Sequence, residues 1–283
     1  MVHVGNGTWS GTWTPSTRTQ GRVTIQYSAF AVAGFSVISG SANVPVTVLS
    51  GSVPQTFATT NAASGVGTFV SPGGLVSIYG ANLAGSVGGA TTTTLPTQVG
   101  DTRVLIAGTA LPLRYVSGGQ VNAQIPFELG INSSQQIVVQ RGTTLSVPQD
   151  ILVAAAQPAI YIDAASGAAI ILNPNTNALI TSANPAKAGD TVVIYCNGLG
   201  AVSPAVPSGT PAPSQEPLAR TANTLTAAIG NVSATVNYAG LAPGYPDLYQ
   251  VNLVVPAGVP PGSAAVVLTI AGQSGPPVTL PVQ

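Results

Sequence analysis

The chain has 283 residues, only 5% of them charged, and a formal net charge of zero. Ordinary soluble domains carry about a quarter charged residues. A nucleic-acid binder needs a basic stripe, and the seven Lys and Arg residues are scattered along the chain. A basic membrane-surface helix is excluded for the same reason. The single histidine, His3, excludes chemistry that depends on paired histidines.

The rest of the composition predicts an all-β protein with many tight turns. There are 33 glycines and 24 prolines, and Val and Thr are abundant. Val and Thr favour strands, whereas the helix formers Glu and Lys are nearly absent. Cys196 is the only cysteine, so no intrachain disulfide is expected. No apolar run of about 20 residues is present, so no transmembrane helix is predicted.

The first 55 residues predict three strands, at 8–14, 22–32 and 41–49. Such a sheet buries little, because the usual stable sandwich has about 100 residues. We therefore expect 1–55 to be an incomplete immunoglobulin-like β segment that another subunit completes. Its aromatic side chains are the candidate subunit-interface residues: Trp9, Trp13, Tyr27 and Phe30. The alternative is that Trp9, Trp13 and Tyr27 form a platform for a sugar.

An internal repeat organises the remainder of the chain. Two β runs that end in an Asn/Gly turn share an Ile-Tyr pair, and two later runs share Gln-Val-Asn followed by a proline. The matching residues are Ile78-Tyr79 with Ile194-Tyr195, and Gln120, Asn122 and Pro126 with Gln250, Asn252 and Pro256. We predict two homologous antiparallel sandwiches, at 56–155 and 156–283, each built of short strands between turn residues.

The predicted strands follow the alternation of apolar and polar residues. In the first sandwich they are 74–79, 102–106, 111–116, 121–125, 136–140 and 149–154. In the second they are 190–196, 224–229, 233–239, 249–255, 264–270 and 278–282. The copies lie 116 residues apart at Ile78 and 130 apart at Gln120. The extra length is the Pro-rich segment 203–217, which we expect to be an extended surface loop.

The polar pairs of the repeat are its most distinctive side chains. Gln120 and Asn122 share one face of a strand, as do Gln250 and Asn252. We expect these amides to hydrogen-bond turn backbones and to act as structural anchors. The alternative is a recognition face.

No sequence motif for catalysis or metal binding is present. The acidic residues lie mostly beside Gly or Pro or at strand ends, where we expect them to cap turns; a glycosidase pair is the alternative. Cys196 lies in an apolar strand and is expected to be a small buried hydrophobe. We therefore predict no enzyme, no cofactor and no metal site.

Residues 61–283 resemble a known family. The motifs SPGGLVSIYGANLA, LPLRYVSGGQVNAQIPFEL, NPAKAGDTVVIYCNGLGAV and LAPGYPDLYQVNLVVPAGVPPG are similar to the uncharacterised carboxy-terminal domain family of Solibacter-type acidobacteria. VSIYGANL and GDTVVIYCNGLG also resemble the IPT/TIG immunoglobulin-like fold, and the amino-terminal segment resembles the last strands of a bacterial immunoglobulin-like repeat. The resemblance implies β-sandwich modules at the end of large secreted or surface proteins, and it implies no activity.

These observations lead to one leading hypothesis. An almost uncharged surface lacks the charges that keep proteins monomeric and sheet edges apart. We expect a secreted, non-enzymatic structural protein whose copies join head to tail by strand complementation into an extracellular filament or matrix. The alternative is an adhesion or carbohydrate-binding module of a larger cell-surface protein, with glycans or surface components as partners. The first residues lack the features of a signal peptide, so an exported form is expected to be mature or truncated.

Overall fold

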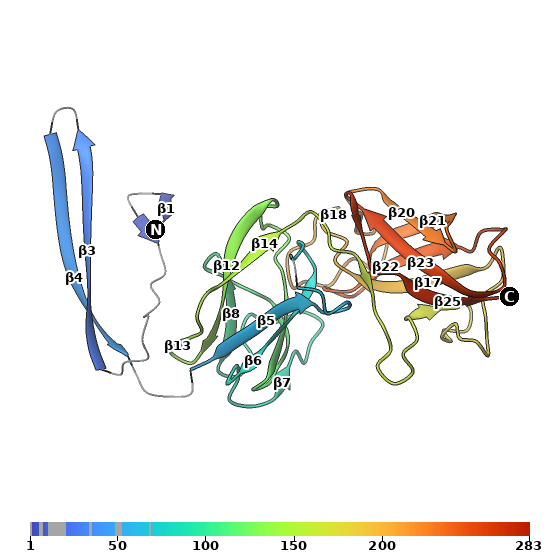
Figure 1. Cartoon of the computed structure of the whole chain (residues 1–283), viewed down its shortest axis with the longest axis horizontal. Coiled ribbons are helices and arrows are strands. Elements are labelled where there is room, and N and C mark those ends of the chain that lie inside the picture. Colours follow the sequence, from blue (N-terminus) through green and yellow to red (C-terminus); the bar gives the residue numbers. More distant parts are fainter. Residues whose placement is uncertain (1, 6–7, 11–20, 34–35, 49–52, 68) are drawn as a thin grey trace. The chain divides into compact units, whose positions relative to one another are not determined.

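The computed structural model describes residues 2–5, 8–10, 21–33, 36–48, 53–67 and 69–283 (Figure 1). These residues form strands and no α-helix, which confirms the all-β class. The chain divides into two compact units, Met1–Ser52 and Val53–Gln283. None of the described residues belongs to a helix long and apolar enough to cross a membrane.

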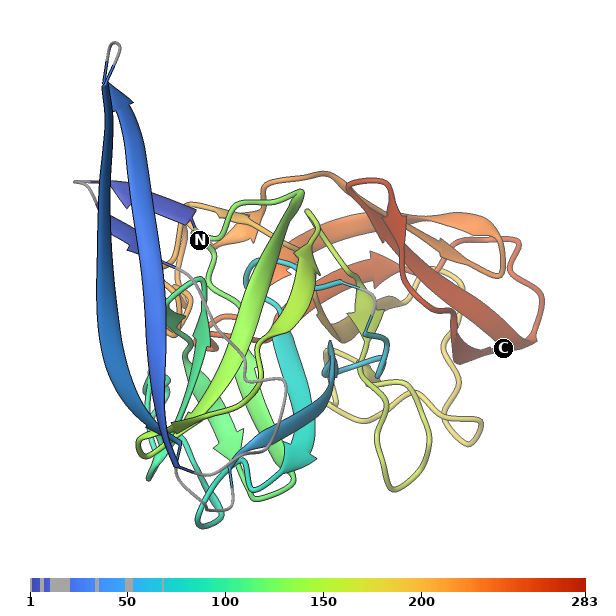
Figure 2. The same ribbon diagram turned by 60° about the vertical axis from the view of Figure 1, so that its left-hand side comes forward.

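The first unit consists, in its described residues, of two antiparallel hairpins. β1 (Val2–Gly5) pairs with β2 (Thr8–Ser10), and β3 (Gly21–Ala33) pairs with β4 (Ser36–Val48). The β3–β4 pairing runs from Gly21↔Val48 to Ala33↔Ser36 without a register shift, and Figures 1 and 2 show the two long strands side by side. Predicted strands 22–32 and 41–48 thus fall in one hairpin, whereas residue 49 and residues 11–14 of the predicted first strand lie outside the described residues.

The first sandwich of the second unit has immunoglobulin-like strand order. One sheet runs β5-β6-β11-β10-β7 and the other β13-β12-β8-β9, with β14 added to β12. The main strands therefore follow the A-B-E-D and C-F-G arrangement of a constant-type immunoglobulin domain. The bounds are β5 (Gln55–Asn61), β6 (Leu75–Ala81), β7 (Gly88–Gly89), β8 (Thr102–Ile106), β9 (Thr109–Ala110), β10 (Leu113–Val116), β11 (Gln120–Gln124), β12 (Ser133–Arg141), β13 (Thr144–Leu145) and β14 (Gln149–Val153).

The second sandwich repeats this pattern. β17 pairs with β22 as β6 pairs with β11, and β23 pairs with β20 and β25 as β12 pairs with β8 and β14. The bounds are β15 (Ala159–Ile160), β16 (Ile171–Leu172), β17 (Thr191–Asn197), β18 (Val202–Ser203), β19 (Arg220–Thr221), β20 (Leu225–Ile229), β21 (Val232–Leu241), β22 (Tyr249–Val254), β23 (Gly262–Ile270), β24 (Gln273–Ser274) and β25 (Val278–Val282).

The repeats differ in the strand that passes from one sheet to the other. In the second sandwich β21 pairs with β20 through its first residues and with β22 through its later ones, so a single strand joins both sheets. In the first sandwich this path is split into β9 and β10, with Pro112 between them. Proline has no N–H to donate to a ladder, which explains why predicted strand 111–116 begins only at Leu113.

Each sandwich encloses its own apolar core. Ile78, Val121 and Val139 are among the residues buried in the first core, and Ile194 and Val251 are among those buried in the second. The register is the same in both copies, because Ile78 faces Val121 and Ile194 faces Val251 across equivalent strands. The repeat found in the sequence is therefore a repeat of core positions.

Two features differ from the sequence expectations. β5 was not predicted, because its sequence QTFATTN lacks a regular apolar alternation; it nevertheless pairs with β6. The Pro-rich segment is not simply a surface loop, since Val206 and Ala212 lie in the second core. Its prolines remove backbone donors as expected, but its apolar side chains still gain by burial.

Candidate functional site

The two sandwiches of the second unit meet in a joint made largely of buried polar groups. Tyr249, at the start of β22, is fully buried and its hydroxyl donates to the Gly200 carbonyl at 2.6 Å, with the Pro72 carbonyl of the first sandwich at 3.4 Å. Burial raises the pKa of this phenol well above 10.0. Gly73 lies so close that a Cβ there would meet the Tyr249 oxygen at 2.3 Å. Only glycine fits this contact.

Two asparagines hold β6 of the first sandwich against β17 of the second. The Asn197 side chain accepts from the Leu75 N–H at 2.8 Å and donates to the Leu75 carbonyl at 2.7 Å. It also donates to the Asn61 amide oxygen at 2.9 Å, while Asn61 donates to the Gln157 carbonyl at 2.8 Å. Asn61 and Asn197 are 2% and 1% exposed. Separating the sandwiches would leave these groups without partners.

The Pro-rich segment contributes to the same joint. The Gln124 amide, fully buried in β11, accepts from the Gly209 N–H at 2.6 Å and donates to the Pro246 carbonyl at 2.6 Å. The Ser208 hydroxyl accepts from the Phe127 N–H at 2.9 Å and donates to a Glu128 carboxylate oxygen. The inserted residues of the second copy thus bind the first copy.

An ion pair closes the joint. Arg114 in β10 donates through Nε and Nη2 to the two carboxylate oxygens of Asp247, a bidentate geometry that favours a strong pair. The Asp247 side chain is 4% exposed, whereas that of Arg114 is 34% exposed. The hydrogen bond to Asp247 raises the pKa of the Arg114 guanidinium. Arg114 lies at the β-bulge between Leu113 and Tyr115 that interrupts the β10–β11 register.

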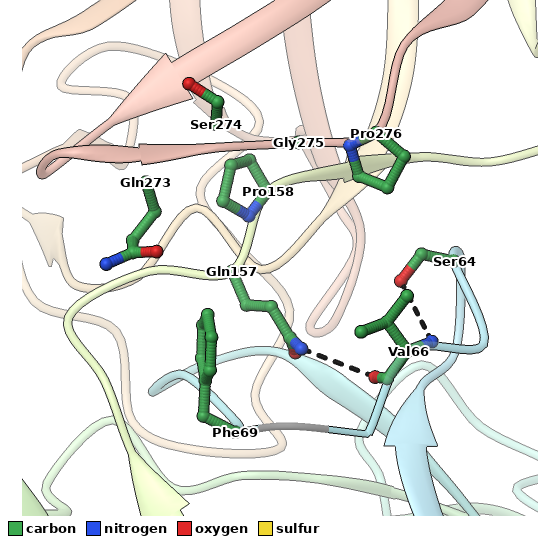
Figure 3. Close-up of a pocket in the computed structure, with 9 residues that line it drawn as sticks. All are labelled: Ser64, Val66, Phe69, Gln157, Pro158, Gln273, Ser274, Gly275 and Pro276. Atoms are coloured by element: carbon green, nitrogen blue, oxygen red, sulfur yellow. Dashed lines mark hydrogen bonds between the residues drawn. The ribbon is translucent and has the colours of Figure 1, made fainter.

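A cleft of about 380 Å³ opens where the joint reaches the surface. Figure 3 shows Phe69 and Val66 on one side and the segment from Gln273 to Pro276 on the other, with Gln157 and Pro158 between them. The complete lining is Ser64, Val66, Phe69, Gln157, Pro158, Gln273, Ser274, Gly275 and Pro276. None of these side chains is charged, so the cleft combines one aromatic ring, prolines, amides and hydroxyls.

The β3–β4 hairpin of the first unit presents two different faces. Successive residues of a strand lie on opposite faces, so the register fixes which positions share a face. By this register, the positions of one face are occupied almost entirely by apolar residue types: Gly21, Val23, Ile25, Tyr27, Ala29, Ala31, Ala33, Ser36, Ile38, Gly40, Ala42, Val44, Val46 and Val48. The positions of the opposite face are occupied mainly by polar residue types, with four apolar ones: Arg22, Thr24, Gln26, Ser28, Phe30, Val32, Val37, Ser39, Ser41, Asn43, Pro45 and Thr47. Val44, on the apolar face, is 43% exposed.

The predicted interface aromatics fall in both hairpins. Trp9 is in β2, at the register position opposite His3, and Trp13 lies outside the described residues. Tyr27 and Phe30 are both in β3 but at positions of opposite faces. The interface of these four aromatics and the alternative sugar platform of Trp9, Trp13 and Tyr27 stay predictions, because Trp13 lies outside the described residues.

The polar pairs of the repeat behave alike. The Gln120 side-chain amide donates to Asn122 Oδ1 at 2.7 Å, and Gln250 donates to Asn252 Oδ1 at 2.9 Å. Each pair is half-buried and lies on the strand next to β6 or β17. These amides bond within the pair rather than to turn backbones. Pro126 and Pro256 follow the ends of the same strands, and Pro126 is buried.

Most carboxylates act on nearby backbone or cationic groups. Asp163, Asp190 and Glu216 each accept a backbone N–H within two or three residues, as predicted for turn caps. Asp101 accepts from the Gly85 N–H and from Arg141, and both bonds lower the pKa of its carboxyl group. Asp247 was expected to cap a turn like the other acids, but it pairs with Arg114, which lies 133 residues away in sequence.

The described residues contain no cluster of three or more metal-ligating side chains. Cys196 is fully buried in the second core, which confirms its expected role as a small hydrophobe. Burial raises the pKa of its thiol.

Comparison with known proteins gives distant similarities of fold. No family model matches the chain, and neither does any curated protein. Among solved structures, SGBP-B from a xyloglucan utilization locus of Bacteroides uniformis is similar at 14% identity and a TM-score of 0.27, over 81% of this chain and 49% of that one. The chain thus spans about half the length of SGBP-B.

Two further similar structures are shorter tandems. Domains 5–6 of the S-layer protein SbsC match at 14% identity and a TM-score of 0.27, over 82% of this chain and 98% of that one. The titin tandem A164–A165 matches at 10% identity and a TM-score of 0.21, over 83% and 98%. At such values the similarities carry no argument about function. Strand order and pairing show that the second unit is a tandem of immunoglobulin-like sandwiches.

Proposed function

We propose that this chain is a secreted, non-enzymatic structural protein of the cell surface whose copies join through the β3–β4 hairpin. The two sandwiches serve as a fixed spacer, because buried hydrogen bonds and an ion pair cross their joint. The hairpin supplies the contacts between copies: its apolar face joins two copies, and strand pairing at its edge extends the assembly. The resemblance to Solibacter-type carboxy-terminal domains supports a surface location.

The observation that carries the proposal is the apolar face of the hairpin. An isolated two-stranded hairpin is at best marginally stable in water. This one extends over 13 residues in each strand, about 40 Å at the usual rise per residue. Ala42 and Val44 on its apolar face are exposed. A partner that covers this face supplies the burial that the hairpin alone lacks.

A second copy of the chain suits this face better than a charged partner. Arg22 is the only charged residue in β3 and β4, so the hairpin offers no charge pattern that a foreign surface could complement. The zero net charge of the chain also gives no repulsion between copies. Two identical apolar faces complement each other in residue type and length and join two copies in a closed pair, so a second contact, at the edge of β3, is needed to extend the pairs into a fibre.

The edge of β3 away from β4, which pairs with no other described strand, is suited to strand pairing. Pro45 in β4 lies opposite Thr24 in β3. Because proline has no backbone N–H, we take Thr24 and Pro45 as a non-hydrogen-bonded pair of the antiparallel ladder. By alternation, even-numbered residues of β3 direct their N–H groups toward the free edge. β3 contains neither Pro nor Lys, the residues that commonly protect edges.

Two substitutions on neighbouring residues test the face. Val44→Lys places a charge on the apolar face, and Asn43→Lys places the same charge on the opposite face. We expect the sedimentation coefficient of the full chain to rise with concentration for wild type and Asn43→Lys, and to stay at the monomer value for Val44→Lys. A monomer in all three proteins, or equal association of all three, would contradict the proposal.

A second pair of substitutions tests the edge. Gln26→Pro removes an N–H that points away from β4, whereas Gln26→Ala keeps it. If copies pair through the β3 edge, association is lost in Gln26→Pro and kept in Gln26→Ala. Association of both variants at the wild-type level would restrict the contact to the apolar face and exclude strand pairing at this edge.

A further inference from the structure

The cleft at the joint of the two sandwiches has no role in the assembly proposed above. Its walls come from three parts of the chain: the segment after β5, the link between the sandwiches, and the β24 region. It exists only when the two sandwiches are held together. We propose that this cleft binds an uncharged oligosaccharide.

The cleft is formed in advance of any ligand. The Asn61 side chain holds the Gln157 carbonyl at 2.8 Å, and the Gln157 N–H donates to the Gly198 carbonyl at 2.7 Å. Gly275 lies against the link so closely that a Cβ would meet the Pro158 carbonyl oxygen at 2.5 Å. The Gly275 N–H donates a hydrogen bond to the Leu268 carbonyl at 2.9 Å. A site with walls fixed in this way loses little entropy when it binds.

The free polar groups in the cleft suit hydroxyls. The Gln273 side chain is exposed and donates or accepts no hydrogen bond within the described protein. Gln157 donates to the Val66 carbonyl at 3.3 Å, which leaves its amide oxygen as an open acceptor. A carboxamide offers two donors and an acceptor, so it can bind a sugar hydroxyl in either sense.

The apolar groups complete the match to a sugar. Phe69 provides a ring on the side of the cleft opposite Gln273 (Figure 3). A pyranose has an apolar face of C–H groups that packs on an aromatic ring, and hydroxyls around its rim. Pockets of a few hundred Å³ that combine apolar walls with a few oriented polar groups are the usual form of small-ligand sites.

Other classes of ligand fit less well. A charged ligand would lose hydration without gaining an ion pair, because none of the lining side chains is charged. A strand-like peptide needs unpaired backbone groups at a sheet edge, and β24 has only two residues. A polyproline peptide docks on several aromatic rings, and Phe69 is the only one in this lining.

The test uses the full chain on an array of neutral glycans, followed by titration calorimetry with the best neutral hexasaccharide. Cellohexaose and mannohexaose are the starting probes, and oligogalacturonate and decaproline represent the charged and peptide alternatives. We expect a neutral oligosaccharide to bind, and Gln273→Ala and Phe69→Ala each to raise its Kd about tenfold, as loss of one stacking or amide contact predicts. Circular dichroism and melting temperature report whether each variant is folded.

Thr143→Ala is the matched control, because Thr143 follows Gly142 as Gln273 follows Gly272 in the equivalent turn of the other sandwich. Its Kd is expected to equal that of wild type. If no neutral glycan bound, the inference would be overturned. Binding of oligogalacturonate or decaproline alone would overturn it as well. Unchanged affinity in a folded Gln273→Ala and Phe69→Ala would place any sugar site elsewhere and would also overturn it. The association tests with Val44→Lys are independent of these results.

Discussion

The two sandwiches are alike in their cores and unlike in the residues that join them. Equivalent strands pair in the same register, and Ile78 and Ile194 are both fully buried. By the same alignment, the polar residues of the joint match unrelated types: Gln124 aligns with Val254, Asn197 with Ala81, Arg114 with Asn237 and Asp247 with Ser117.

This difference shows that the order of the sandwiches is specified. Core positions are constrained in both copies by the same need to fill an immunoglobulin-like sandwich. Joint positions are constrained in only one copy, because each sandwich uses a different surface to meet the other. A second unit with one fixed arrangement is what a spacer between joined copies requires.

The largest expected effect comes from adding a methyl group inside the joint. Gly198 has φ +75°, and a Cβ would meet the Gln157 carbonyl oxygen at 2.0 Å. We expect Gly198→Ala to lower the free energy of unfolding by about 4 kcal/mol or more in urea titrations, because a backbone atom must move. Gly244 has φ +83° but open space around it, so Gly244→Ala should cost only about 1–2 kcal/mol. Equal effects would show that the joint is loosely packed.

The next effect concerns the ion pair of the joint. Arg114→Ala leaves the Asp247 carboxylate buried without its partner, and we expect a loss of about 2–3 kcal/mol, reduced from the fully buried case because Arg114 is partly exposed. The aligned residue Asn237 is exposed, so Asn237→Ala should change the free energy of unfolding by less than about 0.5 kcal/mol. Calorimetric melts of both variants make the comparison. If Arg114→Ala left the free energy of unfolding unchanged, the ion pair would not contribute to the stability of the joint.

A smaller effect is expected in the pH dependence of stability, which comes from two buried groups of the second sandwich. Because burial raises the pKa of Tyr249, the folded protein keeps a proton that the unfolded chain loses above pH 10. Its contribution to stability is therefore full below pH 10 and declines as pH rises further. The buried Cys196 thiol, whose ordinary pKa is 9.0, adds a decline that begins at lower pH. Chemical unfolding measured from pH 8 to 11 should show this loss.

Substitution of the tyrosine assigns part of that loss. Tyr249→Phe should be less stable than wild type at pH 8 by about 1–2 kcal/mol, because the Gly200 carbonyl loses its donor. It should also lose less stability between pH 10 and 11. Tyr79→Phe, at an exposed position of the first sandwich, should change the free energy of unfolding at pH 8 by less than about 0.5 kcal/mol. The same pH curve for Tyr249→Phe and wild type would contradict the role of burial at this phenol.

The smallest effect is expected where the repeat is preserved. Gln120→Ala and Gln250→Ala each remove one half-buried side-chain hydrogen bond, and each should lower the free energy of unfolding by about 1 kcal/mol or less. Because the two pairs have the same geometry, the two losses should agree within about 0.5 kcal/mol. A clearly larger loss at one position would mean that the pairs have acquired different roles.

The sequence predicted the fold class and most of the core strands, but it did not predict the contacts that join the two sandwiches. Ile78 and Ile194 could be aligned because the same core environment selects the same residue type at both positions. β5 escaped prediction because a Thr-rich strand has no apolar period. Asn197 and Asp247 act on groups more than 100 residues away, so no local pattern marks them. The cleft combines three distant segments and is visible only in the folded chain.

The most direct test of the proposed assembly is negative-stain electron microscopy of the full chain beside a chain that begins at Val53. The second unit is compact by itself, so the shortened chain is expected to fold. The account predicts filaments or linear arrays from the full chain and dispersed particles from the shortened one. Dispersed particles from both, or filaments from both, would contradict assembly through the β3–β4 hairpin.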